Sequence, residues 1–394
     1  MSRYFFPYPR FIPLLGLVLS LYGLSIWAVA DAPAVTYSFT ILDVPDAIDT
    51  SADSINASGQ VTGSYWDGSV SHGFMYSNDT FTTFNGPDGT SIEPSSINAS
   101  GQITGRYRAA LTPPSHPSPH GFVYSNGTFA TLDVPSTIGT DAASINASGQ
   151  VTGTYWDSSG AHGFVYSNGT FATLDVPGAV GTIATSINDS GQVTGDYIVG
   201  GSGTHSFVYS NGTYTTLDVP GAIDTQATSI NDSGQVTGTY RDGSGNHHGF
   251  VYSGGTFTTF NGPDTTDAVP SSINASGQVT GGYFVYPVRG SSSNPVIPRV
   301  GSVIPSPVIH GFVYSNGTFM TLDVPGAIDT QAISINDSGQ VAGHYYDGSR
   351  NYGFIATPIG TLTDIPTLSE WAILLLLSLL LGLSGWWLRQ RKLF

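Results

Sequence analysis

Histidines that recur along the chain are the first residues with potential for chemistry. Each one opens a short aromatic segment such as His-Gly-Phe-Val-Tyr, and the six are His72, His120, His162, His205, His248 and His310. Histidine is a common metal ligand, but one ion needs several ligands close together. Because these residues belong to separate copies of one repeat, we expect each imidazole to bond a neighbouring turn instead.

Carboxylates are the second candidate, since a glycosidase needs two of them at a set separation. Many aspartates recur with the repeat, in the sequence Leu-Asp-Val-Pro at Asp133, Asp175, Asp218 and Asp323. Such recurrence indicates strand ends and turns. Glu93 is the only glutamate between residues 31 and 364, and the chain has no cysteine and no isolated Gly-x-Ser-x-Gly elbow. A polysaccharide hydrolase or lyase that depends on Glu93 is therefore an alternative function rather than the first one.

A repeat must position all of these residues. The sequence Ser-Ile-Asn-x-Ser-Gly-Gln opens seven times, at Ser54, Ser96, Ser144, Ser186, Ser229, Ser272 and Ser334. All spacings but the last lie between 42 and 48 residues. A period of about 40 to 50 residues is typical of propellers, solenoids and arrays. We interpret the motif as a strand, a turn and a strand, and not as a site.

One copy, at 227–263, divides into four strand candidates, which we name a to d. They are a at 227–231, b at 235–241, c at 249–253 and d at 256–261. The turns between a and b and between c and d contain Asn and Gly, which accept positive φ angles at low cost. The 50 glycines and 24 prolines of the chain also favour short strands and tight turns. Four antiparallel strands per copy match one propeller blade.

The number of strands predicts a closed ring. A strand d occurs before the first strand a, at 38–44, whereas the last copy ends after its strand c at 353–357. We therefore expect an all-β fold, a seven-bladed β-propeller of four-stranded antiparallel blades that is closed by the N-terminal strand. Closure of this kind hides two sheet edges. An open array of seven repeats is the alternative.

The repeat motifs also resemble a known family. Ser-Ile-Asn-x-Ser-Gly-Gln-x-x-Gly-x-Tyr followed by His-Gly-Phe-Val-Tyr is similar to the bacterial extracellular HAF repeat, over residues 38–357. The family's His-Ala-Phe is His-Gly-Phe here, His-Ser-Phe at His205 and Tyr-Gly-Phe at Tyr352. The resemblance implies an exported repeat protein and supports a location more than an activity.

The N-terminus predicts export. Arg3 and Arg10 precede an apolar run at 11–27, and Ala28-Val29-Ala30 has the small-x-small form that signal peptidase cuts. We interpret residues 1–30 as a signal peptide that is removed between Ala30 and Asp31. An uncleaved anchor helix is the alternative. Both interpretations place the propeller, at 31–360, outside the cytoplasm.

The C-terminus predicts sorting. A linker and the motif Ile365-Pro366-Thr367-Leu368-Ser369-Glu370-Trp371, together 361–371, precede an apolar segment at 372–388 and a basic tail at 389–394. The apolar segment can just span a bilayer as a transmembrane helix, with the basic tail in the cytoplasm. This order closely resembles the bacterial IPTL-CTERM sorting signal. The resemblance implies an exosortase-type protease that cuts near the motif and passes the protein to the cell surface or matrix. A plain anchor is the alternative.

The positions of the arginines indicate a functional face at one end of the ring. Between residues 31 and 364 the net charge is −20, which disfavours nucleic acid as a partner. The arginines of this region lie in or beside the connection from strand b to strand c, at Arg106, Arg108, Arg241, Arg289, Arg299 and Arg350. The insertions that break the period, at 109–119 and 285–309, fall in the same connection. Because b–c and d–a connections leave the same end of a blade, we predict a partner face there.

Aspartates after strand d suggest a cation site. They occur at comparable places in the repeat, at Asp49, Asp141, Asp224, Asp267 and Asp329. If they gather around the mouth of a central channel, a Ca²⁺ ion would relieve their repulsion. The alternative is that they are solvated or hydrogen-bonded in turns.

These features favour an exported protein that acts as a binding or scaffolding module. Its precursor is expected at the inner membrane and the processed form at the cell surface or outside the cell. The expected partner is an extracellular polysaccharide or a surface protein. A polysaccharide-active hydrolase or lyase and a purely structural spacer are the alternatives.

Overall fold

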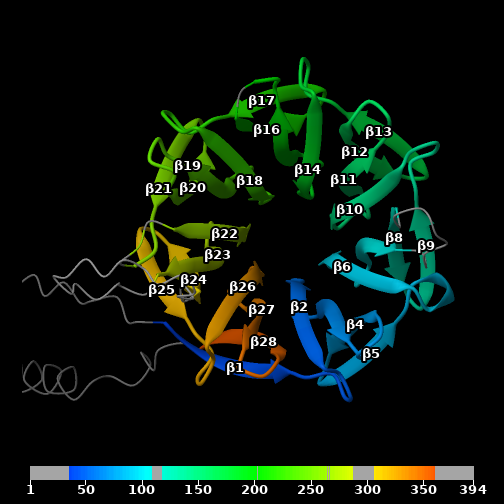
Figure 1. Cartoon of the computed structure of the whole chain (residues 1–394), viewed down its shortest axis with the longest axis vertical. Coiled ribbons are helices and arrows are strands. Elements are labelled where there is room, and N and C mark those ends of the chain that lie inside the picture. Colours follow the sequence, from blue (N-terminus) through cyan, green and yellow to red (C-terminus); the bar gives the residue numbers. More distant parts are fainter. Residues whose placement is uncertain are drawn as a thin grey trace, which may run out of the picture. The chain divides into compact units, whose positions relative to one another are not determined.

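The computed structural model describes residues 35–108, 118–201, 203–263, 265, 267–286 and 306–359. These residues form seven four-stranded sheets around a central axis, as Figure 1 shows, and the compact unit comprises Tyr37–Pro358. The predicted seven-bladed propeller is therefore confirmed. The predicted signal peptide, linker, C-terminal helix and basic tail lie outside the described residues. Within the described part of the chain, no helix is long and apolar enough to cross a membrane.

Each blade contains four strands in the order a to d from the axis outward. Blades 1 to 3 comprise β2 (Asp49–Ile55), β3 (Val61–Trp66), β4 (Ser71–Ser77) and β5 (Thr80–Phe84); β6 (Ser91–Ile97), β7 (Ile103–Arg108), β8 (Pro119–Ser125) and β9 (Thr128–Leu132); and β10 (Gly139–Ile145), β11 (Val151–Trp156), β12 (Ala161–Ser167) and β13 (Thr170–Leu174). Blades 4 to 6 comprise β14 (Gly181–Ile187), β15 (Val193–Ile198), β16 (Thr204–Ser210) and β17 (Thr213–Leu217); β18 (Asp224–Ile230), β19 (Val236–Arg241), β20 (His247–Ser253) and β21 (Thr256–Phe260); and β22 (Ala268–Ile273), β23 (Val279–Val285), β24 (Val308–Ser315) and β25 (Thr318–Leu322). Blade 7 comprises β26 (Asp329–Ile335), β27 (Val341–Tyr346), β28 (Asn351–Ile359) and β1 (Thr36–Leu42), and a 3-10 turn, η1 (Pro87–Gly89), precedes β6.

The N-terminal strand closes the ring, as the strand count predicts. β1 lies beside β28 and is the outermost strand of blade 7, although the two are separated by the whole propeller in sequence. Leu42 at the end of β1 is fully buried, and the rings of Phe39 and Phe354 meet edge to face at 5.8 Å. Arg350 joins the seam by donating to Asp43 Oδ2 at 2.6 Å and to the Ala47 carbonyl at 2.7 Å.

A fixed set of residues builds each blade. The phenylalanine of His-Gly-Phe is fully buried in every copy, at Phe74, Phe122, Phe164, Phe207, Phe250, Phe312 and Phe354. Each strand a carries a bulge opposite a strand-b glycine; in blade 1 a Cβ at Gly63 would lie 1.9 Å from the Ser51 carbonyl oxygen. Only glycine fits there, which explains the glycine of the Val-Thr-Gly sequence.

The asparagine of the Ser-Ile-Asn motif joins the blades into a ring. Each Asn Nδ2 donates to the carbonyl of the equivalent Asn in the next blade at 2.8 to 3.0 Å, in the cycle Asn56, Asn98, Asn146, Asn188, Asn231, Asn274, Asn336 and back to Asn56. The same amide group bonds the Gln of its own turn, as Asn56 does with Gln60 at 2.8 Å. These buried side chains therefore form hydrogen bonds both within their own turn and to the neighbouring blade.

The serine of the motif makes a second cycle. The Ile55 N–H donates to Ser334 Oγ at 3.3 Å across the closing seam, and the same bond recurs between all neighbouring blades. The first Ser, the Asn and the Gln of the motif thus have structural partners in every blade. The interpretation of the repeat as a structural element is confirmed.

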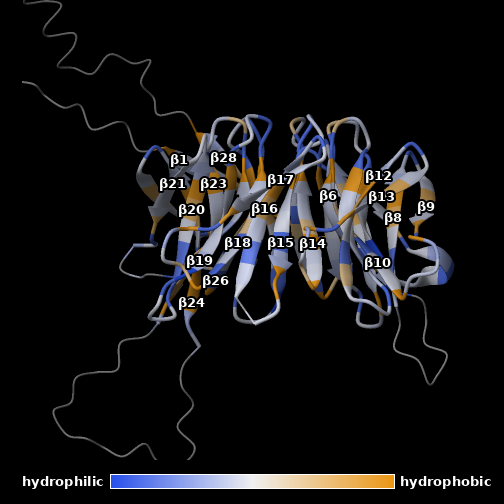
Figure 2. Ribbon diagram, turned by 90° about the horizontal axis from the view of Figure 1, so that it is seen from above, coloured by the Kyte–Doolittle hydropathy of each residue, from blue (hydrophilic) through white to orange (hydrophobic). Residues whose placement is uncertain are grey.

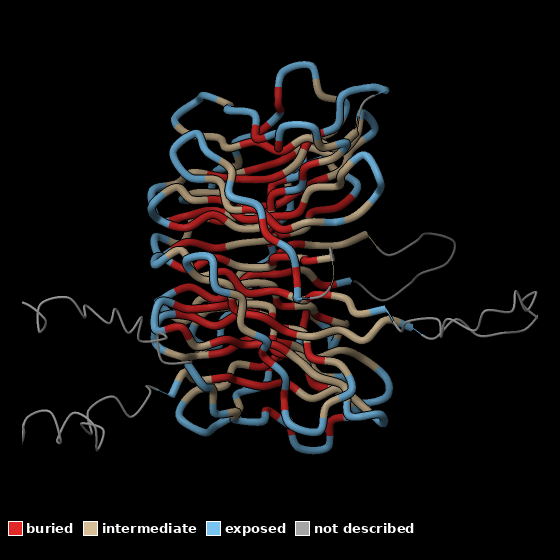
Figure 3. Tube along the Cα trace, turned by 90° about the vertical axis from the view of Figure 1, so that its left-hand side faces the viewer, coloured by how far each residue is buried: buried red, intermediate tan, exposed pale blue. Residues whose placement is uncertain are grey.

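Connections leave the ring at two ends, which Figure 2 shows in side view. The a–b and c–d turns lie at one end, and the b–c and d–a connections lie at the other, because the strands of each blade alternate in direction. Figure 3 shows that buried residues concentrate in the strands and exposed residues in the connections. The start of β1 and the end of β28 both lie at the end that carries the tight turns. The b–c end is therefore opposite to the chain ends of the propeller unit.

Candidate functional site

The predicted arginines separate into different environments. Arg108 and Arg241 end their b strands and are at the b–c end, and Arg350 directly precedes β28 at the closing seam. Arg106 instead lies within β7, where its guanidinium bonds Glu93 Oε2 at 2.7 Å and Asp141 Oδ2 at 2.6 Å across the junction with blade 3. Its place in the strand removes Arg106 from the b–c connection. Arg289 and Arg299 lie outside the described residues.

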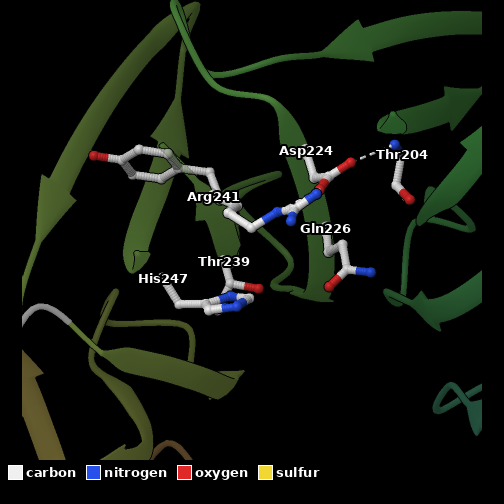
Figure 4. A pocket seen from close by; sticks show the side chains of 7 residues that line it. Thr204, Asp224, Gln226, Thr239, Arg241 and His247 are labelled. Atoms are coloured by element: carbon white, nitrogen blue, oxygen red, sulfur yellow. Dashed lines mark hydrogen bonds and ion pairs between the residues drawn. The ribbon is translucent and has the colours of Figure 1, made fainter. Parts of the chain in front are cut away.

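A groove between blades 4 and 5 brings Arg241 together with other polar groups. Its volume is about 210 Å³, and its lining residues are Thr204 from blade 4 and Asp224, Gln226, Thr239, Tyr240, Arg241 and His247 from blade 5. Arg241 pairs in the sheet with Asp224, and its Nε donates to Asp224 Oδ2 at 2.7 Å. In Figure 4 the guanidinium extends toward Asp224, with Gln226, Thr239 and His247 around the same space.

Asp224 is held as an anion and orients the arginine. The Thr204 N–H donates to Asp224 Oδ1 at 2.8 Å. This bond, followed by the Arg241 guanidinium, lowers the pKa of Asp224. Because both carboxylate oxygens have partners, the groove offers a fixed guanidinium, an amide and two threonine hydroxyls to a ligand. That set suits the hydroxyl groups of a single sugar ring better than a metal ion.

The five aspartates that suggested calcium do not gather at one point. Asp49, Asp224 and Asp329 are the first residues of their a strands, and Asp267 directly precedes β22. Asp141 is the third residue of β10 and bonds Arg106, so its place in the repeat differs from that of the other four. Among the described residues, no three His, Asp or Glu side chains converge as a metal-ligand set. Calcium binding stays a prediction.

The recurrent histidines lie between strands of their own blades. Each Nδ1 contacts the residue that follows strand d, at 2.5 to 3.1 Å: Asn85, Asp133, Asp175, Asp218, Asn261 or Asp323. Each ring also stacks on the tyrosine of strand b, as His162 does on Tyr155 at 5.0 Å. Six equivalent residues in six blades thus bond turns within their blades, in agreement with the expected structural role.

Two carboxyl groups inside the ring are unusually hard to ionise. Burial, followed by the charge of Glu93, raises the pKa of Asp53 to about 7, although Ser51 donates to it at 2.7 Å. Burial raises the pKa of Asp196 to about 6. Asp53 lines a second cavity of about 490 Å³ at the junction of blades 1, 2 and 3, together with Glu93, Arg106 and Asp141. Desolvated acids beside ionised ones are a feature of catalytic and of structural sites alike.

Several of these residues could not be identified from the repeat. Asp53 and Asp196 interrupt positions at which the other blades carry mostly small or neutral residues, and that departure was the available signal. His247 is an extra histidine before the His-Gly-Phe sequence of blade 5. Gln226 belongs to the sequence Ala-Ile-Asp-Thr-Gln-Ala, which occurs in two blades. Their convergence in one groove depends on the pairing of blades.

Comparison with known proteins identifies the C-terminal segment. The IPTL-CTERM motif matches residues 365–391. A sorting signal of this kind implies processing by an exosortase-type enzyme and suggests export to the surface or beyond. No curated protein matches the chain.

Solved structures resemble the chain to different degrees. The β-propeller domain of the Trilobed protease from Pyrococcus furiosus is 8% identical, with a TM-score of 0.52, over 80% of this chain and 95% of that domain. YCF48 bound to a D1 peptide is 9% identical, with a TM-score of 0.49, over 82% and 95% of the two chains. A fungal lectin from Aleuria aurantia is 14% identical, with a TM-score of 0.35, over 57% and 77%. At these identities the first likeness establishes the propeller fold, and the chain carries a C-terminal IPTL-CTERM sorting signal.

Proposed function

We propose that the protein is an exported glycan-binding module of the cell surface or matrix, and that the groove between blades 4 and 5 holds one sugar ring. The observation that carries the proposal is the fixed Arg241–Asp224 pair in a groove with Gln226, Thr239 and His247. Sugar sites combine a few oriented donors and acceptors in this way. The HAF-like repeats and the sorting signal support an exported location.

The position of the groove relative to the ends of the propeller unit supports the same role. The groove opens at the b–c end, whereas both chain ends of the propeller unit leave from the opposite end. The groove therefore lies at the end of the propeller unit opposite to the start of β1 and the end of β28. Connections on a rigid scaffold commonly carry binding residues.

Replacing Arg241 by Ile is expected to weaken binding to the best ligand of a glycan array by about tenfold, because a charged hydrogen-bond donor is lost. Isoleucine stands at the equivalent position of blade 4, as Ile198, so the blade tolerates it. Arg108→Ile is the matched control, since Arg108 occupies this position in blade 2 opposite Ser91. Titration calorimetry measures both. Equal losses in the two variants, or none in Arg241→Ile, contradict the assignment.

Cleavage of polysaccharide is the second candidate, and the cavity with Asp53 and Glu93 favours it. Burial raises the pKa of Asp53 to about 7, and Arg106 bonds the Glu93 carboxylate. A protonated and an ionised carboxyl can serve as acid and base in glycoside hydrolysis. Release of new reducing ends from the array ligand, with loss of that release in Glu93→Gln, would favour this function over binding alone.

A further inference from the structure

The groove between blades 4 and 5 lies at a junction whose aspartate recurs at three other junctions. In blades 5, 6, 7 and 1 an aspartate stands at or directly before the start of strand a, at Asp224, Asp267, Asp329 and Asp49. The other three blades carry Ser91, Gly139 and Gly181 there. Because blade 7 adjoins blade 1, the four aspartates occupy adjacent blades and form one arc at the b–c end, which we call the Asp arc.

The four aspartates share one geometry. Each accepts a backbone N–H from the start of strand c in the preceding blade, from Thr204 at 2.8 Å, His247 at 3.2 Å, Ile309 at 2.8 Å and Asn351 at 2.7 Å. In Asp49 and Asp329 the second carboxylate oxygen has no hydrogen-bond partner among the described residues. These oxygens are available to accept bonds from the hydroxyl groups of a ligand.

A planar side chain accompanies each aspartate. Arg241, Tyr346 and Trp66 pair with Asp224, Asp329 and Asp49 in the register of strands a and b. Phe284 donates its backbone N–H to the Asp267 carbonyl at 3.1 Å and takes the same place in blade 6. Trp66 is 39% exposed, and three of the aspartates follow an exposed isoleucine: Ile48, Ile223 and Ile328. At the junctions of Asp49 and Asp329, an open carboxylate oxygen thus accompanies a planar side chain and an exposed isoleucine.

We propose that the Asp arc binds one extended, neutral polysaccharide, with sugar rings at adjacent blade junctions; this rests on the proposed function. A pyranose ring presents hydroxyl donors at its rim and an apolar C–H face, which match a carboxylate and a planar side chain. A polymer repeats this pattern, as the arc does. Four carboxylates against one guanidinium, in a propeller region with a net charge of −20, disfavour acidic polymers.

The length dependence of binding tests the arc. The full chain in detergent is titrated with ladders of β-1,4- and β-1,3-glucan oligosaccharides, with alginate as the anionic polymer. We expect affinity to rise steadily with length, because linked subsites bind as one. The double variant Asp329→Ser, Asp49→Ser should lower affinity for the longest chains by about tenfold or more and leave the shortest ligand unchanged, since the groove of blade 5 stays intact.

Serine is the matched replacement because it occupies the equivalent position of blade 2. There, Ser91 Oγ accepts the Ser71 N–H at 3.1 Å. Asp79→Gly, in a c–d turn where other blades have glycine, removes a charge from the opposite end and should change nothing. If short ligands bind but affinity does not increase with length, or if the protein prefers alginate, the proposed binding by the Asp arc is wrong. Either result leaves the proposed site in blade 5 unaffected. Absence of binding to every glucan in the ladder, together with no hit on a glycan array, overturns both.

Discussion

A chain that lacks residues 35–44 is expected to melt at least ~10 °C below the intact protein. The deletion removes the outermost strand of blade 7 with Leu42, and also Val44 just after it; these two residues are 0% and 3% exposed. It also uncovers Phe354 and removes Asp43, one of the two hydrogen-bond partners of Arg350 at the seam. Losses of this kind cost at least ~5 kcal/mol in sum, and each kcal/mol lowers the melting temperature of a large domain by about 2 °C.

Differential scanning calorimetry measures this effect, and two further variants serve for comparison. A chain that lacks only residues 31–34 keeps β1 and should melt like the intact protein. Leu42→Ala keeps the strand but leaves a cavity, so it should cost about 2 to 4 kcal/mol even if the deletion does not fold. A deletion that melts at the normal temperature would mean that β1 does not hold the ring closed.

The second large effect is a loss of stability as the pH rises from about 5 to 8. Asp53 and Asp196 have raised pKa values in the folded protein, so the fold binds their protons more tightly than the unfolded chain does. Their ionisation therefore costs stability progressively from about pH 4 up to their folded pKa values of about 7 and about 6. His72 and His162 act in the same direction, because their raised pKa values mean that stabilisation is lost above about pH 6.5.

Other titratable groups limit the pH range of this effect. Burial lowers the pKa of His344, which opposes the trend slightly below pH 6.5. Hydrogen bonds from His72 and from the turn at Val70 lower the pKa of Asp67, so its contribution is complete above about pH 4 and is lost only in stronger acid. The net expectation is a stability maximum near pH 5 and a decrease of about 3 kcal/mol by pH 8.

Asp53→Asn is the diagnostic variant for this decrease. Asparagine cannot ionise, so the variant should be about 2 kcal/mol more stable than the parent at pH 8 and should show a flatter pH profile. Asp133→Asn is the control, because the equivalent positions of blades 1 and 5 carry Asn85 and Asn261. Denaturant unfolding at a series of pH values measures both. Parallel profiles for the parent and Asp53→Asn would contradict the account.

Much of the fold could be predicted from the sequence because the repeat reveals its own period. Strand c of blade 5 was expected at 249–253 and begins two residues earlier, at His247, since hydrogen bonding continues beyond the apolar residues that mark the strand. The displaced strand d before the first repeat predicted closure correctly. Here a count of strands was sufficient, and no knowledge of packing was needed.

The site was less predictable because it forms between blades. Asp224 and Thr204 belong to different repeats, and their contact depends on the rotation of one blade against the next. Asp141 was grouped with Asp224 by its distance from strand d, but it is the third residue of its strand and not the first. A shift of two positions keeps a side chain on the same sheet face and moves it deeper into the ring.

The central claim is that the b–c end of the propeller is a glycan-binding face. Hydrogen–deuterium exchange of the full chain, with and without the best-binding glucan, tests it most directly. The account predicts slower exchange at the starts of strand a in blades 5, 6, 7 and 1, and unchanged exchange in the a–b turns such as 98–102. Protection confined to the a–b turns, or spread equally over all seven blades, would contradict it.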